Sequence, residues 1–238
     1  MSPDWQGAWQ ALIHHPLFGF LITLGAYQVA LMLYERTRSI FLQPVLLSML
    51  LVIGILLLCG LSAEEYREST QILSLLIGPA TVALAVPLYL NLRRIRLLLG
   101  PILLTLLLGG VFASASGVLL ASLFGAEHSV LLSMAAKSAT TPIAMLVTEE
   151  IGGIASLAAV FVMITGVLGG MFGPELLRLI GVNHPAAQGM ALGLTAHAVG
   201  TARAIEEGEE CGAFSALAMS LMGAAVALFL PLAVALIS

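Results

Sequence analysis

The amino-acid sequence predicts an all-α, polytopic membrane protein with about seven to eight membrane segments, including broken or re-entrant helices. Of its residues, 60% are hydrophobic and 9% are charged, whereas soluble domains carry about 25% charged residues. The 24 glycines fit the same class, because small residues let membrane helices approach closely. Apolar runs of spanning length recur along the whole chain, so we expect one membrane domain over residues 1–238.

Four apolar runs are expected to cross the membrane in the first half, residues 1–126. They cover residues 17–34, 44–60, 72–92 and 97–124, with a polar loop at 62–70. The third run contains Gly78, Pro79 and Pro87, which predict an interrupted rather than a continuous helix. The N-terminus lacks the basic start of a signal peptide, so the first run is expected to be retained as a membrane span.

The second half, residues 127–238, also contains four apolar runs, two of them interrupted. They cover residues 130–147, 154–177, 186–204 and 213–237. The first is interrupted by the polar string KSATTP, and the third carries a histidine, an arginine and several glycines. An ionisable side chain at membrane depth costs roughly 2.5 kcal/mol or more. We therefore expect both segments to line a cavity rather than to face lipid.

Arginine clusters constrain the topology, because cytoplasmic loops carry an excess of basic residues. The clusters are Arg36 with Arg38, and Arg93 with Arg94 and Arg96. They lie two spans apart and are expected on the same side, taken as cytoplasmic, which leaves the N-terminus outside. If run 130–147 spans the membrane, Arg178 faces out. If the run turns back at KSATTP, Arg178 faces in and the acidic run 206–210 faces out, which obeys the rule better.

The re-entrant alternative also predicts an internal repeat. Runs 72–92 and 186–204 are both apolar, both interrupted, and both followed by a long span rich in small residues. With a re-entrant run 130–147, they cross the membrane in opposite directions, as the inverted repeats of transporters do. The glycine-rich stretch 166–173 permits a homodimer interface, although packing within the chain explains it equally well.

The segment KSATTPIAM at 137–145 combines the features of an anion site. Ser138, Thr140 and Thr141 offer hydroxyls beside the charge of Lys137. A helix that resumes at Pro142 presents unpaired N–H groups and the positive end of its dipole. These residues are therefore candidates for substrate binding. The alternative is that Lys137 extends to the membrane interface while the hydroxyls bond backbone carbonyls.

The segment 191–214 supplies a second group of substrate-binding candidates, His197, Thr201 and Arg203. His197 and Thr201 share a face if the chain is helical there, and Arg203 is suited to hold a carboxylate through two hydrogen bonds. His197 is also a candidate proton carrier, and Glu206 and Glu207 are further candidates for coupling. The alternatives are that Arg203 pairs with Glu206 or Glu207, that His197 bonds a backbone carbonyl, and that the glutamates form a solvated loop.

Other classes of function are not indicated by the sequence. No cluster has the spacing of metal ligands, no hydrolase or Walker motif occurs, and no basic stripe points to nucleic acid. We therefore expect no catalytic residue, metal, cofactor or enzyme activity. Cys59 and Cys211 are expected to be unpaired packing residues rather than a disulfide.

Four strings in the sequence resemble the LrgB/CidB family of bacterial membrane proteins. They are KSATTPIAM (137–145), EEIGGIASLAAVFVMITGVLGGMFGP (149–174), ALGLTAHAVGTARAIEEGEECGAFSALAM (191–219) and GPATVALAVPLY (78–89). The resemblance covers most of the chain and is strongest after Lys137. The chain departs from the family pattern at Ala139, Ala155 and Ala198, where valine, proline and glycine are usual.

The resemblance implies two functions. Members of this family are described as antiholin-like regulators of murein hydrolases that act with a small membrane partner of the LrgA/CidA type. Related proteins, including a plastid glycolate/glycerate transporter, carry small carboxylates such as pyruvate. The resemblance also implies kinship with the cation/proton antiporter and bile-acid symporter superfamily, which has inverted repeats and broken helices.

We therefore expect a secondary transporter of small monocarboxylates in the bacterial cytoplasmic (inner) membrane, coupled to a proton or cation. The alternative is an antiholin-like regulator of lysis, which needs a surface for its partner but no buried charged site. A passive channel is less favoured, because channels usually present rings of like groups from several subunits. The expected partners are the lipid bilayer, a small carboxylate and the small membrane protein, with no nucleic acid.

Overall fold

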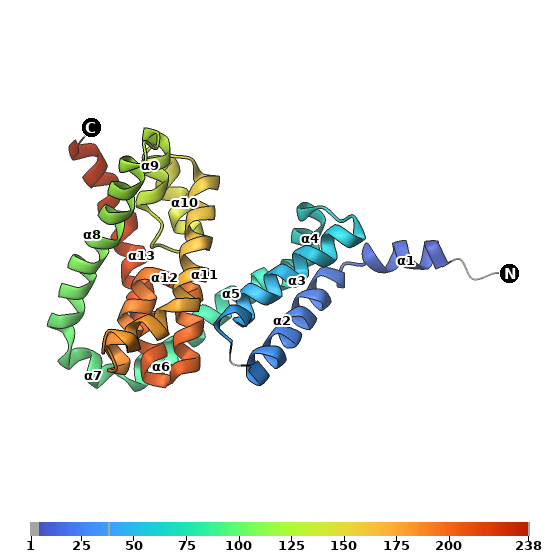
Figure 1. Ribbon diagram of the computed structural model, residues 1–238, viewed down its shortest axis with the longest axis horizontal. Helices are drawn as coiled ribbons and strands as arrows, with labels where there is room; N and C mark the ends of the chain where they lie inside the picture. The colour runs from blue at the N-terminus through green and yellow to red at the C-terminus, as the bar shows by residue number, and fades with distance from the viewer. Residues whose placement is uncertain (1–4, 38, 238) are drawn as a thin grey trace. The chain divides into compact units, whose positions relative to one another are not determined.

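The computed structural model describes residues 5–37 and 39–237, so the predicted role of Arg38 lies outside the described residues. These residues form helices and connecting turns, and no strand occurs among them. Contacts within the chain define two compact units, Met1–Ala83 and Leu84–Ser238, called unit 1 and unit 2 below. Each unit is described by itself (Figure 1). The predicted single domain and its division at residue 126 stay predictions.

Unit 1 is a group of helices in which α2 packs against α3. Its elements are α1 (Trp5–Ile13), α2 (Phe18–Thr37), η1 (Ile40–Leu42), α3 (Pro44–Cys59), α4 (Ala63–Ser69) and α5 (Gln71–Ala83). Helix α3 begins where the side chain of Gln43 accepts a hydrogen bond from the N–H of Leu46, at 2.9 Å. It ends at Gly60, which takes the left-handed conformation (φ 69°) that glycine adopts without steric cost.

Helix α4 replaces the polar loop predicted at 62–70. The N–H of Glu65 donates to the hydroxyl of Ser62, and the carboxylate of Glu65 accepts from the N–H of Ser62, which is a capping box. The spacing of serine and glutamate carries this signal, and the charged composition alone suggested a loop. The hydrogen bonds from the backbone N–H and then the hydroxyl of Ser62 hold the pKa of Glu65 below its ordinary value.

Unit 2 contains three long helices, α8, α11 and α13, with shorter and broken elements between them (Figure 1). Its elements are α6 (Ala85–Leu90), α7 (Leu92–Leu97), α8 (Leu99–Leu123), α9 (His128–Ala135), α10 (Thr141–Glu150), α11 (Ala155–Leu179), α12 (Pro185–Glu207) and α13 (Glu209–Ile237). Helix α12 contains one non-helical residue, His197.

The described helices make this an integral membrane protein with five or six candidate membrane spans. Five segments are long and apolar enough to cross a bilayer, and a sixth is counted if the α3–α4 pair, bent by 114°, is one span. The five are Phe18–Thr37, Gln71–Leu90, Leu99–Leu123, Ala155–Leu179 and Glu209–Leu236. The predicted seven to eight segments included runs 130–147 and 186–204. Neither forms a continuous apolar helix, because the first is split into two short helices and the second is bent at His197.

Helices α9 and α10, with the break at residues 136–140, form a re-entrant turn that we call the first hairpin. The N–H of Ile154, at the start of α11, donates to the hydroxyl of Ser133 in α9, at 2.8 Å. A methyl group on Gly153 would lie 2.6 Å from Thr148 of α10 and 3.0 Å from the backbone of Ser133. If α9 and α10 formed one straight span, the far end of α10 would lie about 15 Å further from α9 than its start does, because α10 has ten residues. The contacts therefore agree with the re-entrant alternative.

Helix α12 also folds back on itself, at His197, and we call it the second hairpin. A straight helix of this length would separate its ends by about 34 Å. Instead, Arg94 contacts His184 before the first arm (3.4 Å) and Glu210 after the second arm (2.8 Å). Gly200 of the second arm also faces the carbonyl of Leu192 in the first arm. The expectation that run 186–204 crosses the membrane is therefore wrong.

Because the second hairpin turns back, the side of the membrane predicted for the acidic run 206–210 is wrong. We expected this run on the side opposite Arg178, because a crossing was assumed between them. Glu207 instead forms an ion pair with Arg178, and Glu210 forms one with Arg94. Both ends of the hairpin therefore lie at the same end of unit 2 as the basic residues of α7. The pairing of runs 72–92 and 186–204 as inverted repeats stays a prediction.

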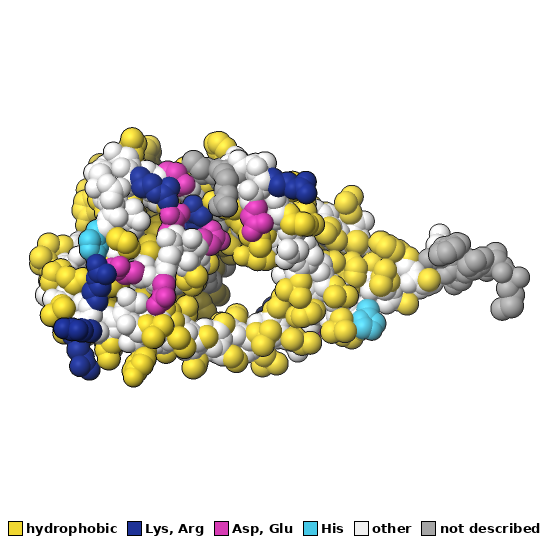
Figure 2. Space-filling model, turned by 90° about the horizontal axis from the view of Figure 1, so that it is seen from below, with side chains coloured by type: hydrophobic (Ala, Val, Ile, Leu, Met, Phe, Trp, Pro, Cys, Tyr) yellow, Lys and Arg dark blue, Asp and Glu magenta, His cyan; other side chains and the backbone are white. Residues whose placement is uncertain are grey.

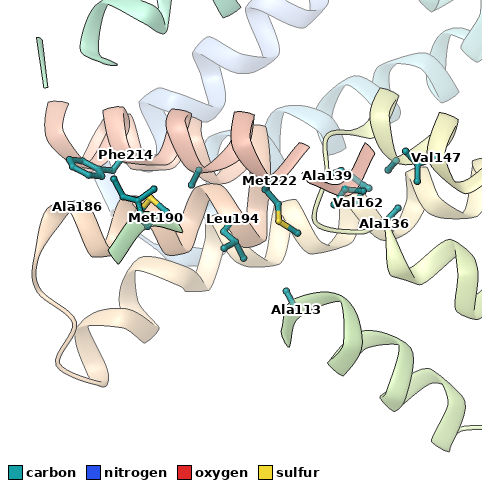
Figure 3. Close-up of a cluster of buried hydrophobic side chains, with 14 of the residues drawn as sticks. Ala113, Ala136, Ala139, Val147, Val162, Ala186, Met190, Leu194, Phe214 and Met222 are labelled. Carbon is teal, nitrogen blue, oxygen red and sulfur yellow. The ribbon is translucent and has the colours of Figure 1, made fainter. Parts of the chain in front are cut away.

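Both hairpins pack against the three long helices. Helix α8 contacts the second hairpin at Gly109 (beside Leu194) and the first hairpin at Gly117 (beside Lys137). Helix α13 contacts the second hairpin through Ser215 and the first through Gly223. One buried apolar cluster links these elements, and Figure 3 shows its residues along α13. The hairpins thus enter unit 2 from opposite ends and share one core.

The glycine-rich stretch of α11 faces the second hairpin. A methyl group on Gly166 would lie 2.6 Å from the ring of His197, and one on Gly173 would lie 2.6 Å from Leu192. Packing within the chain therefore accounts for these glycines, and the homodimer stays a prediction. Both cysteines are free, as expected.

Candidate functional site

The tip of the first hairpin is the five-residue break at 136–140. Thr140 has an extended backbone (φ −70°, ψ 152°) and is the N-cap of α10, whose second position is Pro142. Proline favours the first turn of a helix because its missing N–H would have no intrahelical acceptor there. The string TTP thus explains why the helix restarts at Thr141. The start of α10 lies inside unit 2, with the alanines of the tip in the buried cluster.

This tip carries polar groups that no described residue satisfies. The hydroxyl of Ser138 is buried without a hydrogen-bond partner in the described part of the chain, and the residue is 1% exposed. The side chain of Thr140 makes no capping hydrogen bond, so the N–H groups of Thr141 and Ile143 in the first turn stay available. Among residues 5–37 and 39–237, no hydrogen bond or ion pair engages the side chain of the half-buried Lys137, whose backbone N–H donates to the carbonyl of Met134.

These groups are donors gathered at one place. An ammonium group, a hydroxyl and the start of a helix all favour a negatively charged ligand. A buried hydroxyl without a partner costs about 1–3 kcal/mol, so an occupant that accepts its hydrogen bond would remove this cost. The chemistry of Lys137, Ser138, Thr140 and Thr141 therefore suits a small anion.

The tip of the second hairpin is His197, whose backbone is strained. Its φ of 41° and ψ of −124° make it the one non-glycine residue with positive φ in the described ranges. Such conformations cost roughly 1–3 kcal/mol and persist where the surroundings impose them. Gly200 packs against Leu192, and the bend falls on His197 itself.

The ring of His197 holds the second hairpin to α11. Its Nε2 lies 3.0 Å from the carbonyl oxygen of Val162, so Nε2 carries a proton and donates. Val162 belongs to the same buried cluster as Ala136 and Ala139 of the first tip, and Figure 3 shows the three side chains together. The two tips therefore meet the core at neighbouring places. The geometry matches the alternative in which His197 bonds a backbone carbonyl.

Thr201 does not converge with His197. Its hydroxyl lies 3.0 Å from the hydroxyl of Ser215 in α13 and also reaches the sulfur of Met219. His197 faces α11 and Thr201 faces α13, because the bend rotates the second arm relative to the first. The shared helical face expected from their spacing is therefore absent, and the hydroxyl of Thr201 is occupied by a protein partner.

Arg203 is surrounded by carboxylates. It pairs with Glu206 at 2.7 Å and Glu207 at 2.8 Å, and approaches Glu175 of α11 at 3.7 Å. Its side chain is only 10% exposed. Three carboxylates around one guanidinium leave little positive charge for a substrate, so the geometry matches the alternative of ion pairing along the helix. Glu206 and Glu207, the further coupling candidates, are engaged in the same network.

The sequence did not reveal the wider ion-pair network at this end of unit 2. Arg178 binds Glu207 and approaches Glu175 at 3.9 Å, while Arg94 binds Glu210 at 2.8 Å. Figure 2 views the molecule from below and shows basic and acidic side chains mixed among hydrophobic ones. The signal available in the sequence was the charge of Glu175 and Arg178 within an otherwise apolar helix.

Comparisons with known proteins identify the family. The model of the LrgB-like family matches residues 23–236. The chain belongs to this family. It is 38% identical over 214 residues to the uncharacterized protein YxaC of Bacillus subtilis, which covers 90% of this chain and 93% of the relative. It is 31% identical over 218 residues to an antiholin-like protein LrgB of Bacillus mycoides and to one of Bacillus cereus, covering 91% of this chain and 95% of each relative. No solved structure matches.

These findings confirm the resemblance to the LrgB family. The two relatives named LrgB are described as antiholin-like proteins, and no relative's name includes an enzyme activity or a transported substrate. Of the two functions expected from the sequence, they therefore support the lysis regulator more directly than the monocarboxylate carrier.

Proposed function

We propose that this protein acts in the bacterial cytoplasmic membrane as an antiholin-like regulator of lysis. The support for this proposal is the name of its relatives, which match at 31% identity over 91% of the chain. As a regulator, it binds a small membrane protein of the LrgA/CidA type and limits murein hydrolase activity. The N-terminus lies outside, and the basic residues of α7 face the cytoplasm.

The lysis proposal is tested in bacterial cells in which lysis is triggered by a holin-type protein. Expression of this chain with a small LrgA/CidA-type partner should delay the onset of lysis and lower the released murein hydrolase activity. The measurements are culture turbidity and hydrolase activity on cell-wall substrate, at equal amounts of membrane protein. An unchanged onset of lysis would contradict the proposal.

The geometry of unit 2 favours a second function, and we propose that the protein carries a small monocarboxylate across the membrane. The supporting observation is the tip of the first hairpin, where the hydroxyl of Ser138 is buried without a partner among the described residues. Lys137 supplies the positive charge, and Ser138, Thr140 and Thr141 orient the carboxylate. Broken elements that enter from opposite ends and meet in one core are typical of secondary transporters.

In this carrier, the second hairpin contributes coupling and structure rather than charge for the substrate. His197 retains one ring nitrogen, Nδ1, that accepts a proton when Nε2 donates to Val162. Thr201 and Arg203 hold the arm of the hairpin against α13 and α11. Binding of a carboxylate at the first tip and of a proton at His197 would then act on the same buried cluster.

The carrier proposal is tested by uptake of labelled pyruvate and glycolate into proteoliposomes that contain only this chain, with and without an imposed proton gradient. We expect accumulation driven by the gradient, and loss of uptake in Lys137→Met, which keeps an unbranched apolar stem without the charge. Arg96→Ala is the matched control, because Arg96 is an exposed cation of α7. Normal uptake by the folded Lys137→Met variant would rule out this site.

The two functions are separated by testing the same variants in the lysis assay. A regulator that acts only through its partner surface should keep its effect on lysis when Lys137 is replaced. If lysis control and uptake are lost together in Lys137→Met but kept in Arg96→Ala, then carboxylate flux underlies the regulation. If uptake alone is lost, the two activities are independent.

A further inference from the structure

Gly117 of α8 faces the side chain of Lys137. A methyl group on Gly117 would lie 2.6 Å from Cε and 3.4 Å from Cδ of Lys137, and 3.3 Å from Cγ of Met134. Met134 lies at the end of α9 and Lys137 lies three residues later, in the break, and both lean against the same part of α8. The absence of a side chain at position 117 therefore leaves the space that the stem of the lysine occupies.

On the N-terminal side of this contact, α8 is packed against two other elements. At Gly109, the same kind of methyl would lie 3.1 Å from Leu194 of the second hairpin, and at Gly110 it would lie 3.0 Å from the sulfur of Met222 in α13. Because α8 is packed against these neighbours, a methyl at position 117 displaces the lysine rather than the helix. The side chain of lysine has several rotatable bonds, so this displacement costs little folding energy.

The ammonium group of Lys137 is one bond beyond the Cε that touches Gly117. A displaced Cε changes the position of the charge relative to the hydroxyl of Ser138 and the start of α10, the two other donors at this tip. Electrostatic attraction in a poorly solvated site depends steeply on distance. The space at Gly117 therefore determines whether the charge and the hydroxyl act on the same ligand.

We propose that Gly117 is a positioning residue, which holds the ammonium of Lys137 where it binds one carboxylate group together with Ser138. This inference rests on the carrier function proposed above. It assigns a role in binding to a residue of an apolar helix that carries no polar group itself. The residue acts through Lys137 alone.

The test compares three alanine substitutions in the same helix. Gly117→Ala meets Lys137, Gly109→Ala meets the flexible apolar end of Leu194, and Gly100→Ala meets nothing within 4 Å. For each variant, the concentration dependence of pyruvate uptake gives KM and the maximal rate per folded protein, and the rise in Tm caused by pyruvate gives binding. We expect KM to rise about tenfold in Gly117→Ala, as when a hydrogen bond to a charged group is weakened. The maximal rate should change little, and the other two variants should resemble wild type.

A double variant shows whether Gly117 acts through Lys137. In the Lys137→Met background, Gly117→Ala should cause no further loss of pyruvate binding, because the displaced group is already absent. Further loss there would overturn the proposal, as would an unchanged KM in Gly117→Ala or a fall in maximal rate alone. If wild type and the Gly109→Ala control take up pyruvate while Gly117→Ala equals them, only this inference fails. If wild type neither binds nor transports pyruvate, the carrier function and the inference fail together.

Discussion

The two hairpins of unit 2 have similar architecture but differ in whether their polar groups find partners within the protein. Each consists of two helical arms that turn back inside the unit, the first at residues 136–140 and the second at His197. At the first tip, the hydroxyl of Ser138 is buried and meets no partner in the described ranges. In the second hairpin, Thr201 bonds Ser215 and Arg203 is paired with carboxylates. The first hairpin therefore has donors available for a ligand, whereas the second uses its donors within the protein.

This difference assigns separate roles to residues that look equivalent in the sequence. Lys137 and Arg203 are both cations in interrupted apolar segments, and both were expected to attract a carboxylate. The carboxylates of Glu175, Glu206 and Glu207 already surround Arg203. A cation that is neutralised by its own chain contributes to stability, while one without such partners is available for binding.

The largest expected effect is the loss of stability in Arg203→Met. The substitution leaves Glu206 without its close cation and Glu207 with Arg178 as its remaining one. Removing one partner of a buried ion pair costs roughly 3 kcal/mol. The free energy of unfolding, measured by denaturant titration of the protein in detergent micelles, should fall by about that amount. Pyruvate binding per folded molecule should be retained.

Arg96→Ala is the control for this substitution, since it removes an exposed arginine of α7. Its effect on stability should lie within about 0.5 kcal/mol of zero. If Arg203→Met were as stable as this control but lost pyruvate binding, the assignment would be reversed, and the second hairpin would hold the substrate.

The sequence predicted the structural features whose signal lies within a single stretch of the chain. Apolar runs of 25 residues, such as α8 and α11, were recognised directly from length and composition. The polar interruption at 137–142 was recognised in the same way, because hydroxyls and proline next to a lysine are unusual in a membrane segment. Both signals are contained within a single stretch of chain.

Properties that depend on distant residues were not predicted. The direction of the second arm of α12 is fixed by Arg94, Arg178 and Ser215, which lie on three other elements. An apolar run of spanning length was therefore taken for a crossing. Whether Arg203 is available for a substrate likewise depends on Glu175 in α11, and no local pattern shows that this carboxylate approaches it.

The second prediction concerns the backbone at His197. Glycine is normally about 1 kcal/mol less stable than alanine inside a helix. At φ 41° and ψ −124°, alanine would keep the strain and lose the hydrogen bond to Val162, while glycine would lose the bond but relieve the strain. We therefore expect His197→Gly to be more stable than His197→Ala by about 1 kcal/mol in the same unfolding measurement.

Ala191→Gly is the control that shows the usual stability order of alanine and glycine in a helix, because Ala191 lies in the regular first arm of the same hairpin. This variant should be about 1 kcal/mol less stable than wild type. If glycine were less stable than alanine at position 197 as well as at position 191, the backbone at His197 would not be strained.

The smallest expected effect is on stability, when each of two buried serines is replaced by alanine. One serine lies at the tip of the first hairpin, and the other lies in α13 beside the second hairpin. Ser215 is fully buried and lies 3.0 Å from the hydroxyl of Thr201, so Ser215→Ala removes a hydrogen bond and should cost about 1 kcal/mol of unfolding free energy. Ser138→Ala removes a buried hydroxyl for which no described residue is a partner, so the unfolding free energy should stay unchanged or rise slightly. Only Ser138→Ala should weaken the binding of pyruvate, measured as a smaller rise in Tm. Equal losses of stability in the two variants would show that Ser138 is satisfied within the protein, and the contrast between the hairpins would then rest on Lys137 alone.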